Sequence, residues 1–121
     1  MPVAKVNLAA KLALFSEHFS PKIVGEVNDF HVKLVKVKGE FVWHHHDNED
    51  ELFLVLSGRL TIHFKDGDVV LEPSEFLVVP KGVEHKPSAE EEAHVLLLEP
   101  QSTLNTGNVV NERTVAVLDR L

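Results

Sequence analysis

The sequence predicts an all-β domain, a sandwich or a barrel, with one short helix near its N-terminus. Between residues 30 and 99, short runs of apolar and β-branched residues alternate with glycine or proline turns, and no helical period is visible. Many short strands at near-regular spacing are typical of sandwiches and barrels. The length of 121 residues suits one domain. We therefore expect a single domain over 1–121, with a barrel over about 23–99 and a tail over 100–121.

Composition and charge narrow the class of protein. The chain is 44% hydrophobic and 26% charged, which is ordinary for a folded domain. It has no cysteine, which excludes disulfides, a catalytic thiol and thiolate metal sites. A formal net charge of −7 argues against nucleic-acid binding, because that requires clustered Lys and Arg. No apolar run approaches the roughly 20 residues that span a bilayer, and no signal peptide is recognisable, so we expect no membrane partner and a cytoplasmic location.

The segment 7–16 predicts the helix. Asn7 can cap its first turn, and Leu8, Leu12 and Phe15 fall on one face at i, i+4 and i+7. The alanines of the segment add helix propensity. We expect this helix to lie against the body of the domain.

Short strands are expected after the helix, separated by turn signals. Asn28-Asp29 joins the first two strands, Gly39 ends the second, and Asp66-Gly67 is a dipeptide typical of hairpins. No secondary structure is assigned after residue 101. The expected strands are 23–27, 30–37, 41–46, 51–56, 59–64, 69–71, 76–79 and 93–98.

Two of these strands, Leu52–Leu56 and Phe76–Val79, are apolar at successive positions rather than at alternate ones. A strand with one solvated face alternates apolar and polar residues. We therefore expect part of the barrel exterior to be covered by the N-terminal helix, the C-terminal tail or a second subunit.

The chain contains eight histidines, and three of them stand in a row at 44–46. Residues two apart on a strand point to the same side. His44 and His46 should therefore project one way and His45 the other. Two imidazoles at this spacing can share a metal ion, although a surface location for all three is the simpler alternative.

Two further residues could complete a metal site. If the strands 41–46 and 51–56 form a hairpin, Glu51 lies beside the histidine pair, and His85 can return to the same cavity after the turn at Pro80–Gly82. Three imidazole nitrogens and one carboxylate oxygen leave one or two positions of an octahedral ion open. Phe53 and Val55 share the parity of Glu51 and should line the cavity.

Other motifs and residues are interpreted as structural. The acidic stretch 47–50 lacks the spacing of an EF-hand loop, and no phosphate-binding glycine loop or Gly-x-Ser-x-Gly elbow occurs. His45 and His63 are expected to face outward, Trp43 to pack on the exterior and Arg59 to be solvated.

Two segments resemble the motifs of the cupin superfamily: Gly39-x4-His44-x-His46-x4-Glu51-x6-Gly58 resembles the first, and Pro80-x-Gly82-x2-His85 the second. The resemblance implies a double-stranded β-helix, or jelly roll, in which two antiparallel sheets pack into a small barrel. It also implies one divalent metal ion per chain, with Fe, Mn, Ni and Zn all compatible. The ligands carried over are His44, His46, Glu51 and His85. The sequence departs from the family at Ser74, where Gly usually opens the second motif, and at Ala89, where Asn is expected.

The resemblance is nearest to short single-domain cupins described as mannose-6-phosphate isomerase-like, a label that describes the barrel more than a substrate. It implies an enzyme acting on a small molecule, either isomerase- or lyase-like or an iron-dependent dioxygenase; the alternative is a non-catalytic binding or sensory cupin. Cupins commonly pair sheet to sheet, so we also expect a homodimer. No catalytic acid or base is identifiable from the sequence.

Overall fold

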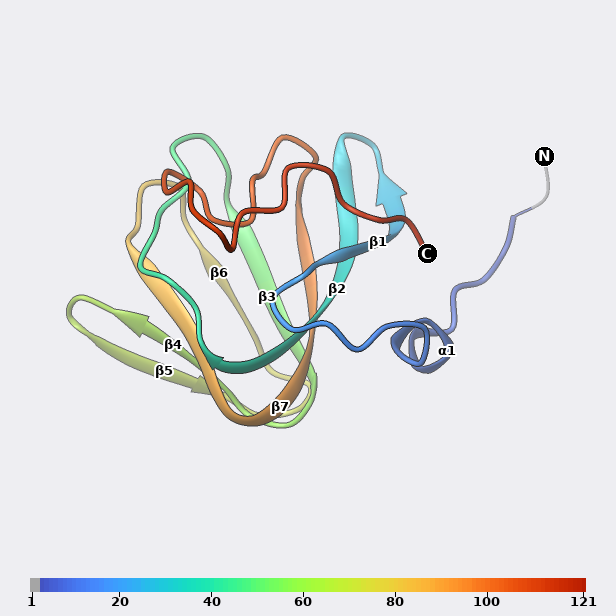
Figure 1. Cartoon of the computed structure of the whole chain (residues 1–121), viewed down its shortest axis with the longest axis horizontal. Coiled ribbons are helices and arrows are strands. Elements are labelled where there is room, and N and C mark those ends of the chain that lie inside the picture. The colour runs from blue at the N-terminus through green and yellow to red at the C-terminus, as the bar shows by residue number, and fades with distance from the viewer. Residues whose placement is uncertain (1–2) are drawn as a thin grey trace.

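The structure is a β-barrel with one short helix (Figure 1). It is a computed structural model, and residues 3–121 are described. All pairings between its strands are antiparallel, which confirms the predicted all-β jelly roll. Within residues 3–121, no helix has the length and apolarity needed to cross a membrane. In chain order the elements are α1 (Leu8–Leu12), β1 (Lys22–Val27), β2 (Phe30–Glu40), β3 (Glu51–Ser57), β4 (Leu60–Phe64), β5 (Gly67–Leu71), β6 (Phe76–Val79) and β7 (His85–Pro100).

The long strand β7 joins the two layers of the barrel. Its second half pairs with β2 and β3, which extends the sheet into the order β1-β2-β7-β3-β6. Its first residues pair with β4, which carries β5 as a hairpin (Figure 1). Inward side chains of both layers form one apolar core, and the open end of this core holds the site described below.

The helix α1 begins where predicted but is shorter than predicted. Asn7 Oδ1 accepts a hydrogen bond from the backbone N–H of Ala10, as expected of an N-cap. The helix ends at Leu12 instead of residue 16, because Phe15 turns its side chain into a buried cluster under the helix. The Phe15 carbonyl then accepts a hydrogen bond from Lys36 Nζ, which fixes this exit from the helix.

The segment 41–46 is not a strand, and that prediction was wrong. Only His44 pairs, in an isolated antiparallel bridge with His85. The N–H of Phe41 donates to the carbonyl of Pro87, but Pro87 has no N–H to donate in return, so the ladder cannot extend. The predicted parity still holds, since His44 and His46 are buried and His45 is only half-buried.

Two strands extend three or more residues beyond their predicted bounds. β2 continues to Glu40, with an irregular register beside Gly39, whose φ of 84° lies in the left-handed region. β7 begins at His85 instead of residue 93, since the acidic residues 90–92 lie on an exposed part of the strand and not in a loop. In both strands the additional residues are defined by backbone pairing with a neighbouring strand and not by apolar side chains.

The outer face of the larger sheet is covered only in part. Phe76, Leu54, Leu96 and Leu34 form a row across β6, β3, β7 and β2, because each is the register partner of the next. At the β2 end, α1 and the C-terminal residue pack over this row, as the sequence predicted. At the β6 end, Phe76 is 61% exposed.

Candidate metal centre

The four residues predicted to bind a metal lie together at the open end of the core. His44, His46, Glu51 and His85 are all buried, and each offers one ligand atom within 4.8 Å of the others. Glu51 opens β3 and His85 opens β7, while the bridge to His85 holds His44 in place. The loop segment 44–46 and the first residues of β3 and β7 therefore converge on one point, although His85 lies 34 residues after Glu51.

Backbone carbonyls orient two of the imidazole rings. His44 Nδ1 lies 2.8 Å from the carbonyl of Val42, and His85 Nδ1 lies 2.9 Å from the carbonyl of Val83. A ring nitrogen that contacts a carbonyl carries the proton, so Nε2 of each ring is left as a free acceptor. His85 Nε2 then faces Glu51 Oε1 at 3.3 Å. Two acceptors at this separation fit a cation bound between them.

His46 supplies the third imidazole of the cluster. Neither of its ring nitrogens has a hydrogen-bond partner within residues 3–121, although the ring is buried. Its Nε2 lies 3.3 Å from Glu51 Oε1. Buried polar atoms are nearly always satisfied, so this orphaned ring fits a metal ligand better than a core residue.

The electrostatics of the cluster suit a cation. Burial, reinforced by the neighbouring His85, lowers the pKa of His44 to about 4, so the ring is neutral at pH 7. Burial on its own raises the pKa of Glu51, but contacts with His46 and His85 outweigh it and hold the pKa well below the usual value. A neutral imidazole and an ionised carboxylate are the forms that bind a metal.

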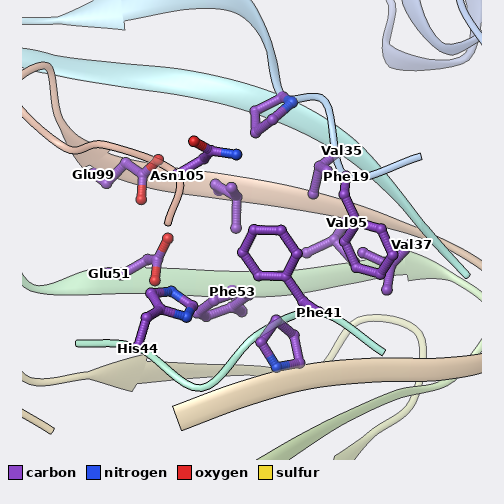
Figure 2. Close-up of a pocket in the computed structure, with 13 residues that line it drawn as sticks. Phe19, Val35, Val37, Phe41, His44, Glu51, Phe53, Val95, Glu99 and Asn105 are labelled. Carbon is purple, nitrogen blue, oxygen red and sulfur yellow. The ribbon is translucent and has the colours of Figure 1, made fainter. Parts of the chain in front are cut away.

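A small cavity of about 40 Å³ opens beside the cluster (Figure 2). Its walls are mostly apolar and include the rings of Phe19, Phe41 and Phe53. Phe53 was predicted to line the cavity; Val55, predicted with it, is buried in the core and does not reach the lining. Sites for drug-sized ligands usually enclose about 300–1,000 Å³, so this cavity suits a small molecule.

Sequence reasoning missed a second carboxyl in the cavity. Glu99 of β7 lines it and faces Glu51 (Figure 2). Glu99 Oε1 accepts a hydrogen bond from the buried Lys33 Nζ at 2.8 Å. Burial and the charge of Glu51 raise the pKa of Glu99 well above its usual value. The signal was present, because Glu99 has the same inward parity as Val95 and Leu97.

Other histidines lie outside the cluster, as predicted. His45 turns away, and its Nε2 lies 2.9 Å from Asp47 Oδ1. His63 lies on the outer face of β4, between Asp68 and Ser88. The sequence alone does not place His18 and His94.

Both of those histidines contact the carboxylate of Glu92 on the exterior. Trp43 is also on the exterior, where Lys65 Nζ lies 3.9 Å from its ring centroid. Arg59 is exposed and pairs with Glu72. The placements of Trp43 and Arg59 agree with a structural interpretation of these residues.

Comparison with known proteins gives consistent matches. The family model described as a cupin domain matches residues 31–99. The uncharacterized protein YdbB of Bacillus subtilis (strain 168) is 48% identical over 81 residues, which cover 66% of this chain and 72% of that protein.

Two crystal structures are similar to this fold. A cupin-2 domain containing protein from Shewanella frigidimarina NCIMB 400 superposes with a TM-score of 0.78 at 49% identity, covering 79% of this chain and 94% of that one. Protein NMB1881 from Neisseria meningitidis superposes with a TM-score of 0.74 at 31% identity, covering 81% of this chain and 100% of that one.

Proposed function

Since this chain belongs to the cupin domain family, we propose that it binds one divalent metal ion inside its barrel and uses that ion on a small organic molecule. One observation carries the proposal: four buried donor atoms lie within 4.8 Å of one another. The orientation of His44 and His85 by backbone carbonyls supports it, since such outer contacts fix metal-binding rings.

Each residue has a definite role in this proposal. His44, His46 and His85 would hold the ion through ring nitrogens and Glu51 through a carboxylate oxygen. Fe, Mn, Ni and Zn all accept such a ligand set. When bound, the ion supplies Lewis-acid chemistry or, if it is iron, oxygen chemistry at its open positions. The apolar wall that includes Phe41 and Phe53 limits the access of water.

Catalysis is the first candidate, of isomerase, lyase or dioxygenase type, because four protein ligands leave one or two octahedral positions for substrate. The small cavity favours a second candidate, which is the binding or sensing of a small molecule without turnover. The two candidates share the metal site and differ only in whether the bound molecule reacts.

Oxygen uptake by the iron(II) form would test the dioxygenase candidate. We expect uptake with at least one member of a panel of small enols, thiols and diketones, and no uptake by His46→Ala. Iron content is measured in parallel. An iron-loaded protein that consumes no oxygen with any member would contradict the dioxygenase candidate and leave the isomerase and binding candidates.

A further inference from the structure

The carboxyl of Glu99 indicates what kind of molecule the cavity binds. Glu99 is buried, and its side chain lines the cavity next to the metal cluster (Figure 2). Lys33 occupies one carboxyl oxygen, Oε1. The other oxygen, Oε2, is buried and receives no hydrogen bond from a donor side chain or backbone N–H within residues 3–121, and the carboxyl also lies against that of Glu51 (Figure 2). Leaving a buried acceptor unsatisfied destabilises the fold, so a partner that enters from the cavity is expected.

Stability does not account for the pair that Lys33 and Glu99 form. Both side chains are about 2% exposed, and burying an ammonium group with a carboxyl group costs roughly what their attraction returns. Apolar residues of similar volume usually stabilise a buried position as well as an ion pair does, or better. A buried polar pair at the wall of a cavity, with one carboxyl oxygen left without a donor, therefore points to a binding role.

The cavity lining restricts the partner further. Among the described residues that form it, the acidic side chains are Glu51 and Glu99, and there is no Lys or Arg. Lys33 lies behind Glu99 and is already paired. Beyond a metal ion bound at the cluster, the lining therefore offers no cationic side chain to pair with an anionic group such as a phosphate, while the phenylalanine rings favour an apolar body.

We propose that Glu99 is a specificity-determining residue that hydrogen-bonds a hydroxyl group of a small neutral substrate, next to the group that the metal binds. This inference rests on the proposed function. A hydroxyl matches Oε2 because it can both donate and accept a hydrogen bond. The substrate class is a neutral molecule of a few heavy atoms with a metal-binding oxygen, an adjacent hydroxyl and an apolar remainder.

The test compares two probes that differ at this hydroxyl. Hydroxyacetone carries it, and methoxyacetone replaces it with a methyl ether. Zinc-loaded protein is titrated with each probe and followed by two-dimensional amide NMR, while zinc content is measured by mass spectrometry. We expect wild type to bind hydroxyacetone at least tenfold more tightly than methoxyacetone.

The variant Lys33→Met/Glu99→Leu replaces the buried pair with apolar residues and should still fold. We expect it to retain zinc and to bind the two probes within about threefold of each other. The control Glu40→Leu/Lys86→Met removes a surface pair that joins the same two strands, and it should keep the wild-type preference. Glu99→Gln, which keeps an acceptor for Lys33, replaces the double variant if that fails to fold, and should lower the preference at least threefold.

Outcomes separate this inference from the proposed function. If zinc does not bind wild type, the proposed function fails. If zinc binds but wild type does not prefer hydroxyacetone, or the Glu99 variant keeps that preference, the role of Glu99 is overturned. Saturable binding of mannose 6-phosphate by the zinc-loaded protein would overturn the neutral-substrate part.

Discussion

At the scale of single residues, burial determines the protonation state of the His44 side chain. The pKa of His44 falls from 6.5 to about 4 in the folded protein, because burial and the nearby His85 disfavour its charged form. The His44 ring is therefore already neutral in the folded protein at pH 7, so a metal ion need not displace a proton from it.

This shift predicts how the stability of the metal-free protein depends on pH. Between pH 6.5 and 4 the unfolded chain binds a proton at His44 and the folded chain does not, so stability is lost as pH falls. The loss from this group should be about 2 kcal/mol between pH 7.5 and 5. Urea denaturation at both pH values should give a shallower pH dependence for His44→Asn than for wild type. Equal dependences would contradict the assignment.

Backbone strain at Ser74 gives a second prediction for a single residue. Its φ of 71° lies in the left-handed region, which explains why the resemblance led us to expect Gly there. Ser74→Gly should raise the unfolding free energy by about 0.5–1 kcal/mol, measured by urea denaturation. Asn28→Gly is the control, because asparagine tolerates its φ of 52° and should gain less. A destabilised Ser74→Gly protein would show that the turn depends on the serine side chain.

At the scale of secondary-structure elements, the side chain of His63 links the β4–β5 hairpin to the rest of the barrel. His63 on β4 contacts Asp68 Oδ1 on β5 at 2.9 Å and Ser88 Oγ on β7 at 2.7 Å. Within residues 3–121, β5 pairs with β4 and with no other strand. The histidine therefore links three adjacent strands across the outer face.

Removing this link should loosen the hairpin. His63→Ala should lower the unfolding free energy by about 1–2 kcal/mol, since two hydrogen bonds are lost, and amide hydrogen exchange should accelerate first in β5. His94→Ala is the control, because His94 contacts Glu92 on its own strand. Unchanged exchange in β5 would show that backbone pairing alone holds the hairpin.

The sequence predicted secondary-structure elements best where the pattern of neighbouring side chains alone indicates a strand. The short apolar run of β6 lies between turns and was located at its true bounds. The predicted strand 41–46 failed because its pairing depends on Pro87, which is remote in the sequence. The His and Glu cluster was found because strand parity and motif spacing are local. Glu99 was missed although its parity is inward, because the predicted strand stopped at residue 98 and because its partner Lys33 lies 66 residues away.

The uncovered apolar face matters at the scale of the whole molecule. Beside the row of side chains that ends at Phe76, a second row on the same face ends at Val78. The side chains of Phe76 and Val78 are 61% and 48% exposed. The helix α1 covers only the opposite end of the rows. We propose that a second copy of the chain covers the β6 end, which gives the homodimer expected from the sequence.

Dimerisation makes a prediction about mass. Light scattering should give twice 13.5 kDa, and Phe76→Lys should reduce the mass to that of one chain. A stable interface buries about 1,200 Å² or more in total, and a charge at its centre opposes that burial. Val117→Lys is the control, because Val117 is 87% exposed in the C-terminal tail. A wild-type mass of one chain at high concentration would contradict the dimer.

The metal centre is the claim on which the proposed chemistry depends, and the metal content of two single variants tests it most directly. Protein purified without added metal should contain about one divalent ion per chain when analysed by mass spectrometry. His46→Ala should lose that ion because it removes one of the four clustered donors, and His45→Ala should keep it because that ring faces away. Loss of the ion in His45→Ala with retention in His46→Ala would contradict the ligand assignment and the strand parity behind it.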